Sequence, residues 1–495
     1  MKRNYFMASN KEVHASSFGE GFVNFFRGIG EYFAEFGKAL AKGDLWVKLS
    51  TVIMGAGCFG RGKYILGVII TLIEALFIYM CIGYAAPNLS KFGTLGDTVR
   101  ETQFDPLTMQ NTVIEGDNSF LILLNSVIAL FLILVFVLFW ISNIKNAYRL
   151  QQDKEKGIHI NTFAEDAKDL LNGNFHVTLL TLPVIGVFVM NIIPILVLIA
   201  IAFTNYDQQH MPPSALFTWV GLTNFKNVLS LSAGQASFGY AFRKILGWTI
   251  VWAFFSTFTC FIGGILMAKM LTYKKVKFPK FWRTLFVVTI AVPQFVTLLL
   301  VKYFFGDYGI FNTFCANIGV TDFFKNIGLI TTDYIPFLTS PGWAKVMIIL
   351  INIWVGVPYQ MLVATGILMN IPESQIESAK LDGANAWQIF WHITMPYVMF
   401  IEGPSLITDF VRNINNFNVI YLLTSDTYQT LDQSLASVRG QEVDLLVTWL
   451  FKLTNDDYNY KMASVIGIIV FVICAVFSLI AFSKFLSGNR EESYQ

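Results

Sequence analysis

Residues 371–396 have the sequence IPESQIESAKLDGANAWQIFWHITMP, and this stretch decides how the chain is organised. Pro372 can open a helix, and Glu373 and Glu377 would then place negative charge in its first turns, where the helix dipole favours it. Gly383 can adopt the left-handed backbone conformation that ends such a helix. The stretch therefore predicts a short helix closed by a sharp turn.

A second short amphipathic helix is expected after this turn. Its apolar residues would be Trp387, Phe390 and Trp391, and Pro396 would mark the start of the following apolar segment. Such a helix–turn–helix between two apolar segments can dock another protein, or it can simply connect the two segments. The residues alone leave both interpretations open.

Apolar segments of membrane-spanning length flank this stretch and recur along the chain. Of the 495 residues, 55% are hydrophobic and 14% are charged, whereas a soluble domain is about one quarter charged. Spanning the hydrocarbon core takes about 20 mostly apolar residues in a helix. Eight segments qualify: 64–86, 119–142, 180–203, 246–268, 284–304, 344–366, 397–422 and 463–483. We therefore expect an all-α polytopic membrane protein with eight transmembrane helices.

The distribution of Lys and Arg predicts how these segments are oriented. Basic residues are concentrated in the N-terminal tail and in the loops after the second and fourth segments, and the intervening loops are poorer in them. Because basic loops remain in the cytoplasm, this alternation predicts that both termini are cytoplasmic. We expect a multi-pass membrane protein.

The N-terminal tail also has a helical pattern. Between Ser17 and Ala41, apolar residues recur at helical spacing: Phe18, Phe22, Phe25, Phe26, Ile29, Phe33 and Phe36. Charged residues such as Arg27 and Lys38 lie between them. This amphipathic helix can lie at the inner membrane surface, or it can pack under the transmembrane bundle. Both interpretations remain open.

Polar and charged side chains are concentrated in the seventh segment. Asp409, Arg412, Asn413 and Asn416 are spaced at i, i+3, i+4 and i+7, so they would share one helical face. That face cannot point at lipid and must meet a partner helix or a wet cavity. Amides and a guanidinium suit sugar hydroxyls, which need donors and acceptors. The alternative is structural, with Asp409 paired to Arg412 and the Asn residues bonded between helices.

Enzyme motifs are absent from the sequence. There is no GxxxxGK[ST] phosphate loop, no HExxH and no GxSxG, and the five His residues are not at metal-ligand spacing. The net charge of +2 does not favour nucleic acid. We expect neither catalytic nor metal-binding residues, and no cofactor in this chain.

The stretch at 371–396 resembles the EAA-x-x-DGA…I-x-x-P loop of the permease subunits of ABC importers. The matching residues are Glu377, Ser378, Ala379, Asp382, Gly383 and Ala384, followed by Ile393 to Pro396. Ser378 replaces the first Ala of the motif, and both residues are small. The resemblance implies a type I ABC importer permease fold in which this loop is the coupling helix that sits in a cleft of an ATPase subunit.

The resemblance extends from about residue 182 to 482 and is to the maltose and maltodextrin permeases. Residues 203–207, 219–225, 416–424 and 447–454 carry it. Eight spans match the eight-span permease subunit better than its six-span partner, and the short loop after the third segment is similar to the Gram-positive versions. The resemblance implies import of maltodextrin-type oligosaccharides with four kinds of partner: a second permease, two ATP-binding subunits, an extracellular sugar-binding protein and the membrane. ATP and Mg would be bound by the ATPase chain. The resemblance also implies that the protein lies in the bacterial plasma (inner) membrane.

The resemblance also implies which residues line the substrate pathway. They are Val355, Gly356, Tyr359, Asp409, Arg412, Asn413 and Asn416. Relatives usually have an apolar or aromatic residue at the position of Arg412 and a small one at that of Asp409. Another sugar, such as a plant-glycan oligosaccharide, is therefore an alternative substrate.

The expected organisation has four parts. Residues 1–63 form the cytoplasmic tail, 64–179 an accessory two-span region, 180–485 the six-span permease core and 486–495 a cytoplasmic C-terminal tail. An ion-coupled secondary carrier is a weaker alternative, because it would have acidic residues in several spans and paired broken helices. A membrane enzyme would need a larger soluble domain than any loop here provides.

Overall fold

The computed structural model describes the chain except for residues 1–17, 106–109, 231–236, 274, 426 and 489–495. The first part of the predicted N-terminal tail and most of the predicted C-terminal tail thus lie outside the described residues. The chain divides into two compact units, residues 1–222 and 223–495. The predicted border at 179/180 between an accessory region and a transport core is a functional division, and it stays a prediction.

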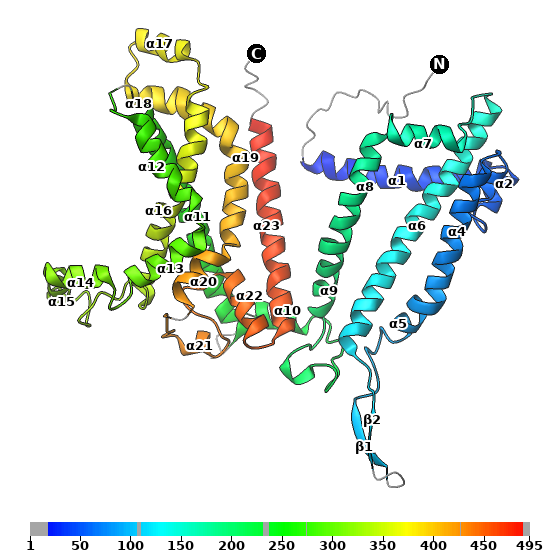
Figure 1. Ribbon diagram of the computed structural model, residues 1–495, viewed down its shortest axis with the longest axis horizontal. Coiled ribbons are helices and arrows are strands. Elements are labelled where there is room, and N and C mark those ends of the chain that lie inside the picture. Colours follow the sequence, from blue (N-terminus) through cyan, green and yellow to red (C-terminus); the bar gives the residue numbers. More distant parts are fainter. Residues whose placement is uncertain (1–17, 106–109, 231–236, 274, 426, 489–495) are drawn as a thin grey trace. The chain divides into compact units, whose positions relative to one another are not determined.

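Among the described residues, the first unit contains three helices that are long and apolar enough to cross a membrane, and a short hairpin (Figure 1). Its helices are α1 (Phe18–Lys42), α2 (Leu45–Leu49), α3 (Ala56–Phe59), α4 (Tyr64–Met80), α5 (Ala86–Ser90), α6 (Ser119–Glu155), α7 (Phe163–Leu171), α8 (Phe175–Val187) and α9 (Ile193–Ile201). The π turns η1 (Cys81–Ala85) and η2 (Phe188–Ile192) join α4 to α5 and α8 to α9, and η3 (Gln208–His210) is a 3-10 turn.

The hairpin is a departure from the expected all-α fold. Strands β1 (Glu101–Asp105) and β2 (Gln110–Ile114) pair antiparallel, with Glu101 opposite Ile114. In Figure 1 the hairpin extends away from the helices of its unit. It lies in the loop between the first two predicted spans.

The second unit is a helical bundle, in which α11 (Phe238–Thr272) packs along α16 (Pro341–Leu368) and α19 (Met395–Ile414). Gly264 allows the close approach of α11 to α16, because a Cβ there would lie 2.7 Å from the main-chain carbon of Gln360. The other elements are α10 (Thr223–Leu229), α12 (Pro279–Ala291), α13 (Gln294–Phe304), α14 (Ile310–Asn317), α15 (Val320–Asn326), α17 (Glu373–Leu381), α18 (Ala386–Ile389), η4 (Phe390–Thr394), α20 (Phe417–Thr424), α21 (Gln433–Ala436), α22 (Leu446–Asn455) and α23 (Tyr460–Gly488).

The molecule is a helical polytopic membrane protein. Among the described residues, six helices are long and apolar enough to cross a membrane, and a seventh is added if α12 and α13 form one span. The predicted seventh segment is not among them, since α19 carries Glu402, Asp409 and Arg412. The expected count of eight thus remains a prediction.

The fifth predicted span, 284–304, is not one straight helix. The helix breaks between α12 and α13, whose axes differ by 94°. Val292 is extended, with φ −78° and ψ 126°, and Pro293 follows it. Proline disfavours the helical conformation in the residue before it and has no N–H to donate, which accounts for the break.

Candidate functional site: a polar cavity and the 371–396 loop

A cavity of about 900 Å³ lies within the second unit. It is bordered by α11, the break between α12 and α13, α16, α19 and the start of α20. All seven residues predicted for the substrate pathway line it: Val355, Gly356, Tyr359, Asp409, Arg412, Asn413 and Asn416. The structure therefore brings these residues together, and their contact with a substrate stays a prediction.

The only two charged side chains on the cavity wall, in the described part of the chain, form an ion pair. The Nη2 atom of Arg412 lies 3.0 Å from Oδ1 of Asp409, and Gln360 donates from Nε2 to Oδ2 of the same carboxylate at 2.9 Å. The side chain of Asp409 is 16% exposed, whereas that of Arg412 is 66% exposed. The carboxylate thus anchors the guanidinium, which keeps donors available on the cavity side.

The predicted common face of the seventh segment is only partly correct. Asp409, Arg412 and Asn413 lie on α19, but this helix ends at Ile414, and Asn416 instead caps α20. The side chain of Asn416 accepts a hydrogen bond from the main-chain N–H of Val419. Asn side chains compete for local backbone donors and favour caps over helix interiors, which accounts for the interruption.

Asn413 and Asn416 nevertheless remain neighbours on the cavity wall. Asn416 donates from Nδ2 to Oδ1 of Asn413 at 3.3 Å, and Asn413 donates to the hydroxyl of Thr257 on α11 at 2.9 Å. The structural interpretation of this segment, with an ion pair and interhelical amide bonds, therefore describes real contacts. The same side chains also line the cavity, so the two interpretations are compatible.

Aromatic surface faces the cavity from α16. Trp354 is 57% exposed and Tyr359 is 50% exposed. Both residues line the cavity together with Phe417 of α20. Aromatic faces beside amides and a guanidinium combine an apolar platform with donors and acceptors, which is the combination that a sugar ring with its hydroxyls requires.

Sequence reasoning missed the residues at the helix break. Thr289, Gln294 and Thr297 line the cavity because α12 and α13 diverge there. On a straight fifth span these side chains would have been assigned to packing or lipid. The signal that could have found them is Val292-Pro293-Gln294, a proline followed by a polar side chain in the middle of an apolar segment.

The 371–396 loop has the predicted helix–turn–helix form. Pro372 immediately precedes α17, and Gly383 has φ +82°. The N–H of Ala384 bonds to the carbonyl of Ala379 at 2.9 Å, and that of Gly383 to the carbonyl of Lys380 at 3.1 Å. These two bonds are the pair that ends a helix with a left-handed glycine.

The helix after the turn is longer than predicted, because it continues into α19. Asn385 and Gln388 cap it reciprocally, and the chain then runs through α18 and the π turn η4 into α19. Pro396 therefore lies inside a continuous helical stretch and does not interrupt it. A proline has no N–H to donate to the preceding turn of a helix, and its ring needs extra space there. The π turn η4, which is wider than an α-helical turn, provides this space.

The predicted apolar residues of this second helix divide into two groups. Phe390 is buried, whereas Trp387 is 69% exposed and Trp391 is 45% exposed. Leu381, at the end of α17, is 89% exposed. The six predicted coupling residues are adjacent on this exposed loop, and four of them line a shallow groove: Ala379, Asp382, Gly383 and Ala384. A large apolar surface here favours docking over mere connection.

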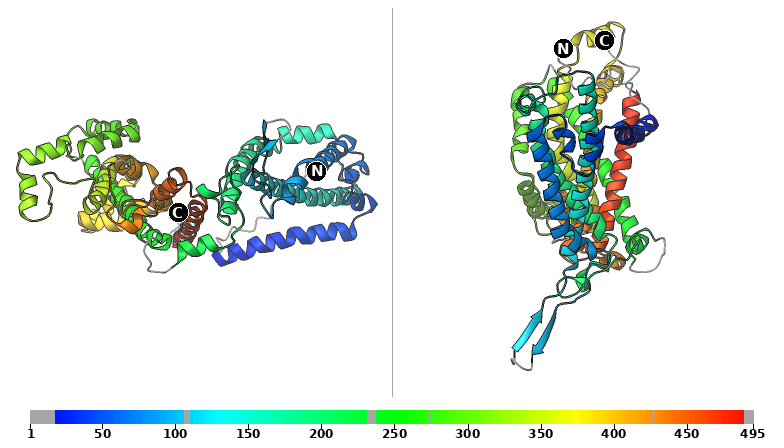
Figure 2. Two further views of the ribbon diagram at one scale, coloured as in Figure 1. Left: turned by 90° about the horizontal axis from the view of Figure 1, so that it is seen from below. Right: turned by 90° about the vertical axis from the view of Figure 1, so that its right-hand side faces the viewer.

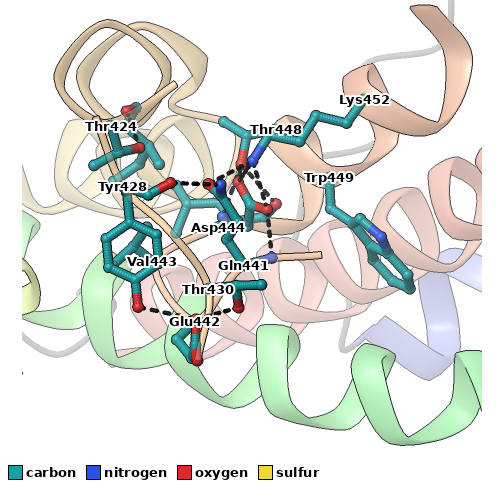
Figure 3. Close-up of polar contacts among 12 residues, drawn as sticks. Thr424, Tyr428, Thr430, Gln441, Glu442, Val443, Asp444, Thr448, Trp449 and Lys452 are labelled. Atoms are coloured by element: carbon teal, nitrogen blue, oxygen red, sulfur yellow. Dashed lines mark hydrogen bonds and ion pairs between the residues drawn. The ribbon is translucent and has the colours of Figure 1, made fainter. Parts of the chain in front are cut away.

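The segment between α20 and α23 is held by two buried carboxylates (Figure 3). Glu442 accepts a hydrogen bond from the hydroxyl of Tyr428 at 2.9 Å, and from the main-chain N–H groups of Leu431 and Asp432 at 3.0 and 2.9 Å. Burial raises the pKa of Glu442, but the hydrogen bond from the hydroxyl of Thr430, together with these bonds, outweighs it and holds the pKa below its ordinary value.

The second carboxylate, Asp444, pairs with Lys452. The ammonium group lies 2.8 and 2.9 Å from the two carboxylate oxygens, and Thr448 donates to the same group at 2.9 Å. The segment is tied to α11 as well, because Trp248 donates its indole N–H to the carbonyl of Val443 at 3.0 Å. Sequence reasoning had no signal for this network, since its members are spread over polar loop residues.

Comparison with known proteins gives consistent results. Residues 260–488 match the family described as the binding-protein-dependent transport system inner membrane component. The maltodextrin transport system permease protein MalC of Streptococcus pneumoniae is 32% identical over 447 residues, which cover 90% of this chain and 96% of that protein. The galactooligosaccharides transport system permease protein GanP of Bacillus subtilis is 28% identical, with coverage of 90% and 98%.

Among solved structures, the chain is similar to one of a bacterial ABC transporter involved in the import of the acidic polysaccharide alginate. The match has 23% identity and a TM-score of 0.47, and it covers 65% of this chain and 98% of the other.

Proposed function

Because the chain belongs to the sugar-importing permeases of binding-protein-dependent ABC transporters, we propose that it carries maltodextrin-type oligosaccharides into the cell. Members of this family are membrane components of transport systems that work with a binding protein and an ATPase, and they are not catalytic. The proposed substrate class rests on the relationship to MalC at 32% identity.

The observation that carries the proposal is the polar cavity of the second unit. Its volume of about 900 Å³ lies within the range of about 300–1,000 Å³ that is usual for ligand sites. Amides, hydroxyls, an anchored guanidinium and aromatic faces surround it. These groups can bond sugar hydroxyls and stack on sugar rings, whereas a crevice that faces lipid would not carry the polar ones.

We propose eight spans with both termini in the cytoplasm. Six of them are the long apolar helices. The broken pair of α12 and α13 forms another span, and α19, whose polar side faces the cavity, forms the last of the eight. The alternation of basic loops supports this topology. It places the 371–396 loop in the cytoplasm, and the segment between α20 and α23 on the outer side.

The proposed mechanism is alternating access driven by ATP in partner chains. An extracellular binding protein delivers the sugar to the outer side, and this chain and a second permease enclose it. ATP and Mg bind in two ATPase subunits, whose closure moves the 371–396 loop. That loop is continuous with α19 through α18 and η4, so a displacement of the loop is carried to the Asp409 region of the cavity.

A second candidate substrate is a plant-glycan oligosaccharide that is not a maltodextrin. The ion pair of Arg412 and Asp409 favours this alternative, because relatives usually have uncharged residues at both positions. The similarity to GanP at 28% identity is compatible with it. Uptake measured with a panel of gluco- and galacto-oligosaccharides distinguishes the two candidates.

Co-purification from the native membrane in mild detergent tests the proposal as a whole. Wild type is expected to bring down an ATP-hydrolysing chain and a second permease. The Asp382→Lys and Gly383→Pro variants are expected to retain the permease and lose the ATPase. Recovery of this chain alone in every case would support a self-contained carrier and contradict the proposed assembly.

A further inference from the structure

Helix α1 exposes a row of large apolar side chains. Val23 is 54% exposed, Ile29 is 40% exposed and Phe33 is 51% exposed, and Phe26 in the same region is 54% exposed. At 100° per residue these positions fall on one side of the helix. A row of this size on a surface in water would be unusual for a stable protein, so it requires a partner environment.

A different side of α1 is fixed to α6 within the first unit. Phe36 packs against Trp140 with ring centroids 5.5 Å apart. Glu35 pairs with Lys145 at 2.7 Å, and the ammonium group of Lys145 lies 3.8 Å from the centroid of the Tyr32 ring. These contacts hold the orientation of α1, so the exposed apolar row is not a consequence of a free helix.

The polar residues of α1 lie on a third side. Arg27, Glu31 and Lys38 are spaced at i, i+4 and i+11, and all three are exposed. The helix therefore has one side that packs on α6, one that is apolar and exposed, and one that is charged. A helix that lies between protein and water needs only a side that packs on protein and a charged side.

The position along α6 at which α1 crosses it identifies what surrounds the exposed apolar row of α1. Figures 1 and 2 show α1 running across the direction of α4 and α6. Its contacts on α6 lie between Leu138 and Lys145. There the apolar run of α6, which still exposes Leu134 and Leu138 by 56% and 46%, gives way to charged residues. In a spanning helix this change marks the border between hydrocarbon and headgroups.

We propose that α1 is an interfacial helix that lies along the membrane surface. Val23, Ile29 and Phe33 enter the acyl-chain region, and Arg27, Glu31 and Lys38 lie in the headgroup layer. The occupant of the apolar row is therefore phospholipid. This conclusion resolves the two interpretations of the tail, because α1 uses one side for the bundle and another for lipid.

Fluorescence quenching in phospholipid nanodiscs tests this proposal. The full-length chain carries Ile29→Cys in a Cys81→Ser background, since the other four cysteines are buried. A bimane label at position 29 is expected to show blue-shifted emission and several-fold stronger quenching by doxyl-labelled lipid than by aqueous iodide. Phe33→Cys repeats the measurement one turn further along the helix.

Lys38→Cys is the matched control on the charged side of the same helix. Its label is expected to show the reverse preference, with stronger quenching by iodide. Equal iodide quenching at positions 29 and 38 would mean that the apolar row faces water and would overturn the proposal. Protection of position 29 from both quenchers would mean that protein covers it, which also overturns the proposal.

Discussion

Trp252 donates its indole N–H to the main-chain carbonyl of Asn413 at 3.0 Å. Trp252 is fully buried on α11, and Asn413 lies in the last turn of α19 beside the cavity. The last carbonyl groups of a helix have no N–H partner within the same helix. A hydrogen bond from a side chain of a neighbouring helix can therefore fix the position at which α19 ends. The bond thus holds the interruption between α19 and α20 in place.

We expect Trp252→Phe to loosen this interruption. The variant loses one buried hydrogen bond and some packing volume, which together cost about 1–2 kcal/mol of stability. Uptake should fall several-fold, because Asn413 and Asn416 would no longer be held on the cavity wall. Thermal unfolding in detergent and transport in proteoliposomes measure the two effects separately.

Trp282→Phe is the control for this prediction. Trp282 is 42% exposed on α12, so the same chemical change should alter neither stability nor uptake appreciably. Equal behaviour of the two variants would show that the bond from Trp252 has no part in positioning the cavity residues.

Arg412→Ala should change which sugars are carried. The guanidinium is anchored by Asp409 and is exposed to the cavity. A hydrogen bond from a charged donor contributes about 1.5–3 kcal/mol, which corresponds to roughly 10- to 150-fold in apparent affinity for a sugar that uses it. Competition between oligosaccharides during uptake measures this change in selectivity.

Arg439→Ala is a matched control, because Arg439 is also exposed and is paired with Asp457 at 3.6 Å away from the cavity. Its selectivity should equal that of wild type. Unchanged selectivity in Arg412→Ala would contradict the assignment of α19 to the substrate pathway.

Local features were predicted well from the sequence where a residue type strongly favours one conformation. Gly383 was expected to end a helix in the left-handed conformation, and it does so with φ +82°. The grouping of Asp409, Arg412 and Asn413 followed from helical spacing and is also observed. Asn416 was assigned to the same helix, because spacing alone cannot tell a continuing helix from one that ends and restarts with an Asn cap.

The features that the sequence did not predict depend on distant parts of the chain. A proline such as Pro293 within an apolar segment is compatible with a kink or a complete break, and neighbouring helices decide between them. The network of Glu442 and Asp444 differs, because its partners lie within 14 residues along the chain but mostly in an irregular segment, where helical periodicity predicts no contacts. Hydrophobic periodicity locates spans, but it does not reveal which polar side chains meet.

Gly383→Ala should weaken the turn of the 371–396 loop without a steric clash. No heavy atom lies within 4 Å of a Cβ placed there, so the cost comes from the left-handed conformation alone and is about 1–2 kcal/mol. We expect normal insertion but reduced coupling of ATP hydrolysis to uptake. Gly366→Ala, which also meets no atom within 4 Å but has no positive φ, should behave as wild type.

The stability of the segment between α20 and α23 should depend on acid pH through Asp432. The ammonium group of Lys244 lies 2.5 Å from its carboxylate, and Tyr240 donates to the same oxygen at 2.7 Å. The side-chain bond from Lys244 is the main reason that the pKa of Asp432 falls from 3.8 to about 2. Because this pKa is lowered on folding, the stabilisation is present above pH 4 and is lost as the pH falls from about 4 to 2.

Asp432→Asn measures this contribution directly. At neutral pH the variant should be less stable than wild type by about 1 kcal/mol, a value kept small because Lys244 is partly exposed to solvent. The difference in thermal unfolding between variant and wild type should then narrow as the pH is lowered from 6 towards 3. Asp457→Asn, which removes a carboxylate from a looser pair at 3.6 Å, should show little difference at any pH. A gap between Asp432→Asn and wild type that stays constant with pH would mean that Asp432 does not stabilise the segment through its charge.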